Sequence, residues 1–167
     1  MYTDASGRGF VAAVLFDCSS SAPLVWSHRL PNAVRSLLKK RRNQIAMFEL
    51  LAVIAGFLLL GPFFSHGRLT LHVDNQTALG WLRNGFCHKD AVDCLRLIAL
   101  FWEQVALLSV DVDLRWVPSS ANLADGPTHP GEAGRMSALE SLLPIALPST
   151  PVPSIIVTTL KEGLHGV

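Results

Sequence analysis

The sequence predicts an α/β fold: a mixed five-stranded sheet with helices on both faces, in the element order βββαβαβα. Three observations predict it. Three short runs rich in β-branched and aromatic residues open the chain, separated by turn residues as in an antiparallel meander. A long apolar segment without strand-like alternation follows. After it, strand-like and helix-like patterns alternate, and the interval between the last two strands is predicted to hold two consecutive helices, which the order above counts as one helical element.

Length and composition exclude several other classes of protein. The chain has 167 residues, the size of one ordinary domain. Half of these residues are hydrophobic and 16% are charged, which excludes an intrinsically disordered chain and a coiled coil. The formal net charge is only +1, so a nucleic-acid partner would have to be held by local patches. Three cysteines without ligand-like spacing and the lack of a signal-peptide pattern indicate reduced thiols and an intracellular protein of the cytoplasm or nucleus, not a secreted one.

The first half of the chain supplies the meander and a polar connection. The three expected strands are Tyr2–Asp4, Phe10–Phe16 and Leu24–Leu30. Turn residues separate them, including Gly7 and Gly9 after the first strand and Pro23 before the third. A basic connection, 31–43, follows and is expected to hold one helical turn at 34–40.

The apolar segment Gln44–Leu60 is predicted to be a helix that ends before Gly61-Pro62. Its alternative interpretation is a transmembrane helix, because 45–64 is twenty residues long and follows the basic run KKRR. Glu49 lies inside this span, where a carboxylate is costly in lipid. The stop at Gly61-Pro62 also makes the helix short for a bilayer. We therefore expect a buried core helix and no membrane contact.

The second half of the chain alternates strands and helices. The remaining strands are predicted at Leu69–Val73 and Val110–Val117, the second with the alternation of an edge strand. Asn75 is expected to cap a short helix that ends at Asn84-Gly85. Further helical patterns cover 90–108 and 132–143. We expect one domain over 1–143 and a Pro/Ser/Thr-rich tail over 144–167 with little regular structure.

Four acids stand where this order of elements places a reactive site. Asp4 and Asp74 each end a strand, Glu49 lies one turn into the apolar helix, and Asp125 follows the last strand. In open α/β sheets, sites form at strand ends. Each acid alone also fits a local role, such as a turn, an N-cap or a buried paired carboxylate. Together they would repel one another unless a cation joined them, and carboxylates are the ligands that Mg²⁺ prefers.

The acids lie in or beside four recognisable stretches: YTDASGRGF (2–10), QIAMFELLAV (44–53), LTLHVDNQTALGWL (69–82) and LRWVPSSANLADGPTH (114–129). These stretches resemble ribonuclease H-like domains, in particular those that follow reverse transcriptase in retroelement (retrotransposon) polyproteins. The resemblance implies a metal-dependent endonuclease, a hydrolase that cleaves the RNA strand of RNA–DNA hybrids. It further implies that two Mg²⁺ or Mn²⁺ ions, bound by Asp4, Glu49, Asp74 and Asp125, activate a water and stabilise the leaving oxygen. A reverse transcriptase domain in a longer polyprotein is the expected covalent partner.

Basic and amide side chains near these acids are the candidates for nucleic-acid binding. The run 39–42 could contact phosphates, and the neighbouring amides could reach the minor groove, where 2′-hydroxyls distinguish RNA. The full set of candidates is Ser6, Lys39, Lys40, Arg41, Arg42, Asn43, Gln44, Asn75 and Gln76.

Two departures from the family's pattern keep a second hypothesis open. Many members carry a histidine in the loop before the last acid, but here this loop is 118–121 and has none; His129 lies beyond the acid. The first strand also has few residues before Asp4. The alternative is therefore a catalytically inactive remnant that binds nucleic acid or packs on a polymerase domain. Exonuclease and integrase chemistries are minor alternatives, because Ser6, Glu103 and Asp111 do not supply the acids that those families need.

Overall fold

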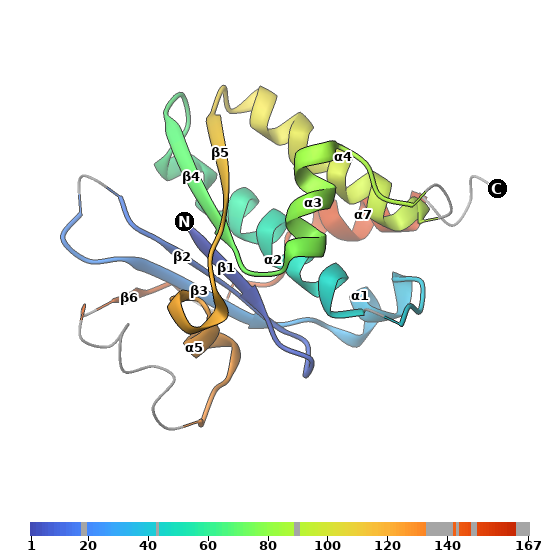
Figure 1. Cartoon of the computed structure of the whole chain (residues 1–167), viewed down its shortest axis with the longest axis horizontal. Helices are drawn as coiled ribbons and strands as arrows, with labels where there is room; N and C mark the ends of the chain where they lie inside the picture. Colours follow the sequence, from blue (N-terminus) through green and yellow to red (C-terminus); the bar gives the residue numbers. More distant parts are fainter. Residues whose placement is uncertain are drawn as a thin grey trace.

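The protein is described from a computed structural model that covers residues 1–17, 20–42, 44–88, 91–132, 142, 144–147 and 150–162. Its centre is a six-stranded mixed sheet in the order β5-β4-β1-β2-β3-β6, with helices packed on both faces (Figure 1). This is the arrangement of a ribonuclease H-like fold. The fold class predicted from the sequence is confirmed, and one short edge strand is added to it.

The five predicted strands all form. The strands β1 (Tyr2–Ala5), β2 (Phe10–Leu15) and β3 (Leu24–Arg29) make the antiparallel meander. The strand β4 (Arg68–Val73) pairs parallel with β1, and β5 (Asp111–Trp116) pairs parallel with β4 at the edge of the sheet. Because β1, β4 and β5 run in the same direction, their carboxyl ends lie along the same side of the sheet, the side at which these three strands end.

The long apolar helix α2 (Gln44–Leu60) covers one face of the sheet. It packs on β1, β2 and α4, and 13 of its 17 residues are buried. The contact with β2 is close at Gly56, where an added Cβ would lie 2.7 Å from the Cβ of Ala13. Gln44–Phe63 is the one segment of the described chain that is long and apolar enough to cross a membrane, and its burial is that of a core helix.

The helices that surround the sheet have recognisable ends. α3 (Gln76–Asn84) begins at Asn75, whose side chain accepts hydrogen bonds from two backbone N–H groups, and ends at Gly85 in the left-handed conformation with φ 64°. Both features were predicted. α4 (Val92–Leu107) follows, and the expected start at Asp90 lies outside the described residues. The shorter elements are α1 (Asn32–Leu37), η1 (Gly61–Phe63), η2 (Ser119–Ala121) and α5 (Asp125–Thr128).

The opposite face of the sheet is covered mainly by α5, which contacts β1, β2 and β3. Alternation along β2 shows the two faces: Val11 and Ala13 belong to the main core, whereas Ala12 and Val14 form a smaller cluster with Ala124. The thiols of Cys87 and Cys94 are free and buried, as expected for small apolar side chains, and Cys18 lies outside the described residues.

The C-terminal segment is more ordered than its composition predicted. The two-residue strand β6 (Ile145–Ala146) pairs parallel with β3, and α7 (Ser154–Glu162) packs on α4 and α1 (Figure 1). Ile156 and Leu160, one helical turn apart, are fully buried there. Prolines flank both elements, which is why composition alone predicted little structure. Most of the helix expected over 132–143 lies outside the described residues.

Candidate metal centre

The topology of the sheet brings the four predicted acids to one edge. Asp4 is in β1, and in the parallel register Thr3 lies opposite Val73, so Asp74 follows β4 next to Asp4. Asp125 begins α5, after the chain has left the carboxyl end of the neighbouring strand β5. Glu49 reaches the same place from α2, which packs across β1.

A cavity of about 290 Å³ at this edge is lined by all four acids. One ligand atom from each of Asp4, Glu49 and Asp74 can be chosen so that all three lie within 4.8 Å of one another. A second group with the same spacing contains Asp4, Asp125 and His129. The four acids therefore form two overlapping clusters that share Asp4.

Several contacts outside the acids fix their positions. The Asn122 side chain donates to the backbone oxygen of Thr3 (3.0 Å) and accepts from the N–H of Ala124 (3.2 Å), which ties the start of α5 to β1. The hydroxyl of Thr128 donates to the carboxylate of Asp4. On the other side of the cavity, Trp116 Nε1 donates to the backbone oxygen of Asp74 (3.0 Å).

Electrostatics in the cavity oppose the simultaneous ionisation of the acids. Burial, and then the charges of Asp4 and Asp74, raise the pKa of Glu49 to about 10. Burial is also the main cause that raises the pKa of Asp4 to about 6, against the lowering effect of the Thr128 hydrogen bond. Without a cation, these two carboxyl groups hold protons at higher pH than exposed carboxyl groups do.

The residues present fit a divalent metal. Glu49 is 3% exposed, and its Oε2 has no hydrogen-bond partner among the described residues. A buried carboxylate oxygen without a partner is costly unless a cation or a proton occupies it. Mg²⁺ and Mn²⁺ take such oxygen ligands. The structure thus shows an acidic cluster, Asp4, Glu49 and Asp74, that could hold a divalent metal on a ribonuclease H-like sheet.

Three candidate nucleic-acid-binding residues, Ser6, Asn75 and Gln76, follow β1 and β4, and they line two different hollows. Ser6 and Asn75 line the acidic cavity. Ser6 is buried and also accepts a long backbone hydrogen bond from Phe10 (3.3 Å). Gln76 is exposed and lines a separate hollow with Arg83 and Trp116, beside α3 and β5.

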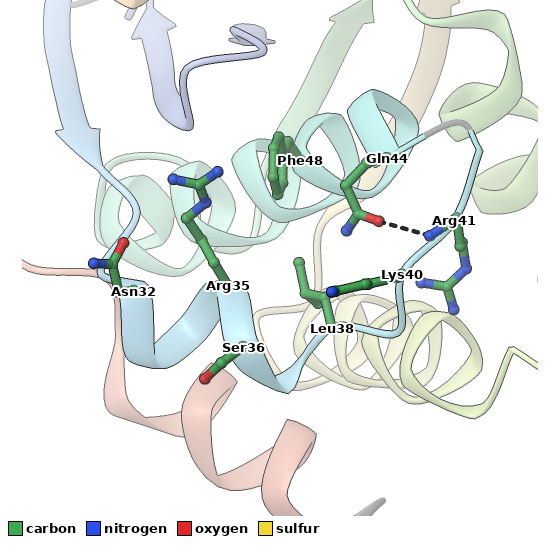
Figure 2. Close-up of a pocket in the computed structure, with 8 residues that line it drawn as sticks. All are labelled: Asn32, Arg35, Ser36, Leu38, Lys40, Arg41, Gln44 and Phe48. Carbon is green, nitrogen blue, oxygen red and sulfur yellow. Dashed lines mark hydrogen bonds between the residues drawn. The ribbon is translucent and has the colours of Figure 1, made fainter.

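Three of the candidates from the basic connection line a larger cavity between α1 and the start of α2. Lys40, Arg41 and Gln44 face this cavity of about 570 Å³ (Figure 2). Its wall also includes Arg35, whose guanidinium lies 5.7 Å from the centre of the Phe48 ring. The sequence analysis missed Arg35, because only the shape of α1 brings it beside α2. Gln44 and Phe48 face this cavity while the next residues along α2, Ile45 and Glu49, face the acidic one.

Two residues of the basic connection, Lys39 and Arg41, also make structural contacts with α4. Arg41 forms a nearly buried ion pair with Asp93 of α4, and the same carboxylate accepts from the backbone N–H of Lys39 (2.9 Å). This contact holds the pKa of Asp93 below its usual value against the opposing effect of burial. Arg42 is exposed, and Asn43 lies outside the described residues.

Comparisons with known proteins add no family assignment. No family model, curated protein or solved structure matches the chain. The fold and the acidic cluster therefore stand on the geometry alone. Two polar residues beside the acids were not among the predicted site residues: Thr128, whose hydroxyl donates a hydrogen bond to Asp4, and His129, which lines the cavity one turn beyond Asp125. The spacing of Asp125 and His129 is the only sequence signal that could have found the second.

Proposed function

We propose that the protein is a metal-dependent endonuclease that cleaves the RNA strand of RNA–DNA hybrids. The observation that carries this proposal is Glu49: a buried carboxylate on an apolar helix, with an unpartnered oxygen in the described structure, in the cavity that Asp4 and Asp74 also line. Together with the ribonuclease H-like sheet, such a cluster supports phosphodiester hydrolysis better than a purely structural role.

The residues of this chain have distinct tasks in that reaction. Asp4, Glu49, Asp74 and Asp125 would hold two Mg²⁺ or Mn²⁺ ions, which when bound activate a water and stabilise the leaving oxygen of a phosphodiester. Thr128 and Asn122 keep Asp4 and the start of α5 in place through their hydrogen bonds. The cavity opens to solvent at the ends of the strands, so a nucleic-acid chain can reach it. Ser6 and Asn75 can there contact the sugar–phosphate backbone.

The basic cavity supports a duplex substrate. It lies on the face of the first turns of α2 next to the one that carries Glu49, with Arg35 and Lys40 in its wall. One strand at the acidic cavity and the partner strand at the basic one would be contacted from the same helix. Cations at this second position would contribute the salt-dependent part of binding. The 2′-hydroxyls of the RNA strand distinguish it from DNA in the minor groove.

The biological setting belongs to the same proposal. We propose that this activity works beside a reverse transcriptase in a retroelement polyprotein, inside the cell, and the resemblance of the sequence to such domains supports this proposal. Hybrids are formed there when a polymerase copies RNA into DNA, so the expected partner is both the source of the substrate and a neighbouring domain.

The test is cleavage of a labelled RNA–DNA hybrid by the purified chain in Mg²⁺ or Mn²⁺. We expect cleavage of the RNA strand that is abolished by Asp74→Asn and by chelation of the metal. Asp111→Asn is the matched control, because Asp111 is an exposed acid of β5 outside the cavity, and it should leave the rate unchanged. Unchanged cleavage in Asp74→Asn would remove the assignment.

A second candidate function is a hybrid-binding module without catalysis. It is favoured by the loop around η2, residues 118–121, which contains no histidine. Hybrid binding at the basic cavity, with no cleavage in either metal by a folded protein, would support this alternative. Cleavage that depends on Asp74 would reject it.

A further inference from the structure

The second acidic cluster differs in chemistry from the first. Asp4, Glu49 and Asp74 offer oxygen atoms only, whereas the group of Asp4 and Asp125 includes a ring nitrogen of His129, all within 4.8 Å. His129 lines the same cavity, and its ring lies beside the acids although the sequence places it after them. The unpartnered, buried Glu49 oxygen in this cavity is an independent sign that a cation belongs there.

The imidazole of His129 is held in place by α5. Its Nδ1 lies 3.0 Å from the backbone oxygen of Asp125 and 3.5 Å from the carboxylate Oδ1 of the same residue. A carbonyl oxygen only accepts hydrogen bonds, so in the tautomer that donates from Nδ1 to this oxygen, Nε2 carries the lone pair that a metal ion binds. Histidines that bind metals commonly use one ring nitrogen for the metal and donate the other N–H to a carbonyl.

We propose that His129 supplies a nitrogen ligand to the cation held by Asp4 and Asp125, so that this site prefers Mn²⁺ or a similar transition-metal ion to Mg²⁺. This inference rests on the proposed two-metal function and adds a difference between the two sites. Mg²⁺ binds through oxygen ligands and gives up its water reluctantly, whereas imidazole suits transition metals. The oxygen-only cluster of Asp4, Glu49 and Asp74 accordingly suits Mg²⁺.

Pulsed electron paramagnetic resonance of bound Mn²⁺ tests this assignment without measuring catalysis. The full chain is loaded with one equivalent of Mn²⁺ in excess Mg²⁺, so that Mg²⁺ fills the oxygen-only site. We expect modulation from a directly bound ¹⁴N nucleus, and we expect it to change when histidine alone is labelled with ¹⁵N. This measurement needs no variant, so it remains decisive even where a substitution disturbs folding.

Variants then identify the histidine. His129→Asn should remove the nitrogen signal and weaken Mn²⁺ binding in excess Mg²⁺ by at least about tenfold, the lower end of losses seen even for outer partners of metal ligands. His129→Asp should also lack the nitrogen signal but keep a cation with less preference for Mn²⁺, because it restores an oxygen ligand. His66→Asn is the matched control, since His66 is exposed near β4 and its left-handed φ of 58° suits asparagine.

The outcomes separate the two proposals. Mn²⁺ bound with oxygen ligands only, or a nitrogen signal that survives His129→Asn, overturns the role of His129 and leaves the four carboxylates as the metal site. Failure of the wild-type chain to bind Mn²⁺ at all, or total Mn²⁺ binding in the absence of Mg²⁺ that is unaffected by Asp74→Asn and Glu49→Gln, overturns the metal centre itself and with it the proposed function.

Discussion

The surroundings of the Glu49 side chain disfavour its charged form when no metal is bound. This side chain is 3% exposed on an otherwise apolar helix, and the charges of Asp4 and Asp74 act on it. Burial, the largest effect, raises its pKa from 4.5 to about 10, so the metal-free protein holds it protonated at neutral pH. A carboxyl group in this condition destabilises the folded state, which is typical of residues retained for function rather than for stability.

Glu49→Gln is therefore expected to stabilise the metal-free protein at alkaline pH. The pKa is higher in the folded than in the unfolded chain, so the stability that the protonated group contributes is fully present below about pH 4.5 and is lost as the pH rises toward about 10. Glutamine does not ionise. In chelator, we expect a gain of about 1–3 kcal/mol in the free energy of unfolding at about pH 9 and none at about pH 4, measured by chemical denaturation.

Glu103→Gln provides the control for this prediction, because Glu103 is an exposed residue of α4. It should change the free energy of unfolding by less than about 0.5 kcal/mol at every pH. Mn²⁺ should reverse the order, stabilising the wild-type chain more than Glu49→Gln, since a ligand that binds only the folded state stabilises it. Equal stability of wild type and Glu49→Gln across the pH range would show that Glu49 is not strained by its surroundings.

Among the elements, α2 depends on one close contact with the sheet. Gly56 faces β2 where an added Cβ would lie 2.7 Å from Ala13, closer than two carbon atoms can pack. Gly56→Ala should therefore push α2 from the sheet and lower the free energy of unfolding by about 1–3 kcal/mol, as overpacked cores do. Thermal and chemical denaturation of the purified variant measure this change.

Gly80→Ala is the matched control in another helix. Gly80 is within α3 and has no atom within 4 Å of the Cβ position among the atoms that the structure describes. Alanine is the better helix former, so this change should raise the free energy of unfolding by up to about 1 kcal/mol. A loss of stability in both variants, or in neither, would contradict the assignment of the close contact to Gly56.

The elements were predictable from the sequence to the extent that their signals are local. The helix α2 was placed at its observed bounds, Gln44–Leu60, because Gly61-Pro62 stops it, and α3 was recognised by its Asn75 cap. The strand β6 was not predicted, since two residues carry no periodicity and its formation depends on the free edge of β3. The helix α7 was not predicted either, because it is short and follows a proline-rich segment whose composition indicated little regular structure.

The candidate site divides in the same way. Asp4 lies near the end of β1, and Asp74 and Asp125 come after β4 and β5, so their convergence was predictable from the order of elements. The second cluster was not, because His129 meets Asp125 only through the short turn of α5. Arg35 likewise reaches the basic cavity only through the packing of α1 against α2. Sequence patterns predict at which end of the strands the acids gather. The additional side chains that short helices bring beside a site, such as His129 and Arg35, can be identified only from the structure.

In the molecule as a whole, the C-terminal part of the core is separate from the elements that hold the acids. The acidic cavity is built by β1 and the turn after it, the start of α2, the turn after β4, η2 and α5. The C-terminal helix α7 packs on α4 and α1, and neither of these helices supplies a residue to the acidic cavity. The stability that α7 contributes can therefore be changed without changing the metal ligands.

Ile156→Ala tests this separation. Ile156 is fully buried between α7 and the rest of the core, so truncation should lower the free energy of unfolding by about 2–5 kcal/mol. The adjacent Ile155 is 41% exposed, and Ile155→Ala should change it by less than about 0.5 kcal/mol. At a temperature where both variants are folded, Mn²⁺ affinity should equal that of the wild type. Weaker Mn²⁺ binding in folded Ile156→Ala would show that the packing of α7 affects the positions of the acids through α2. This helix carries Glu49 in its N-terminal half and contacts α4, on which α7 packs.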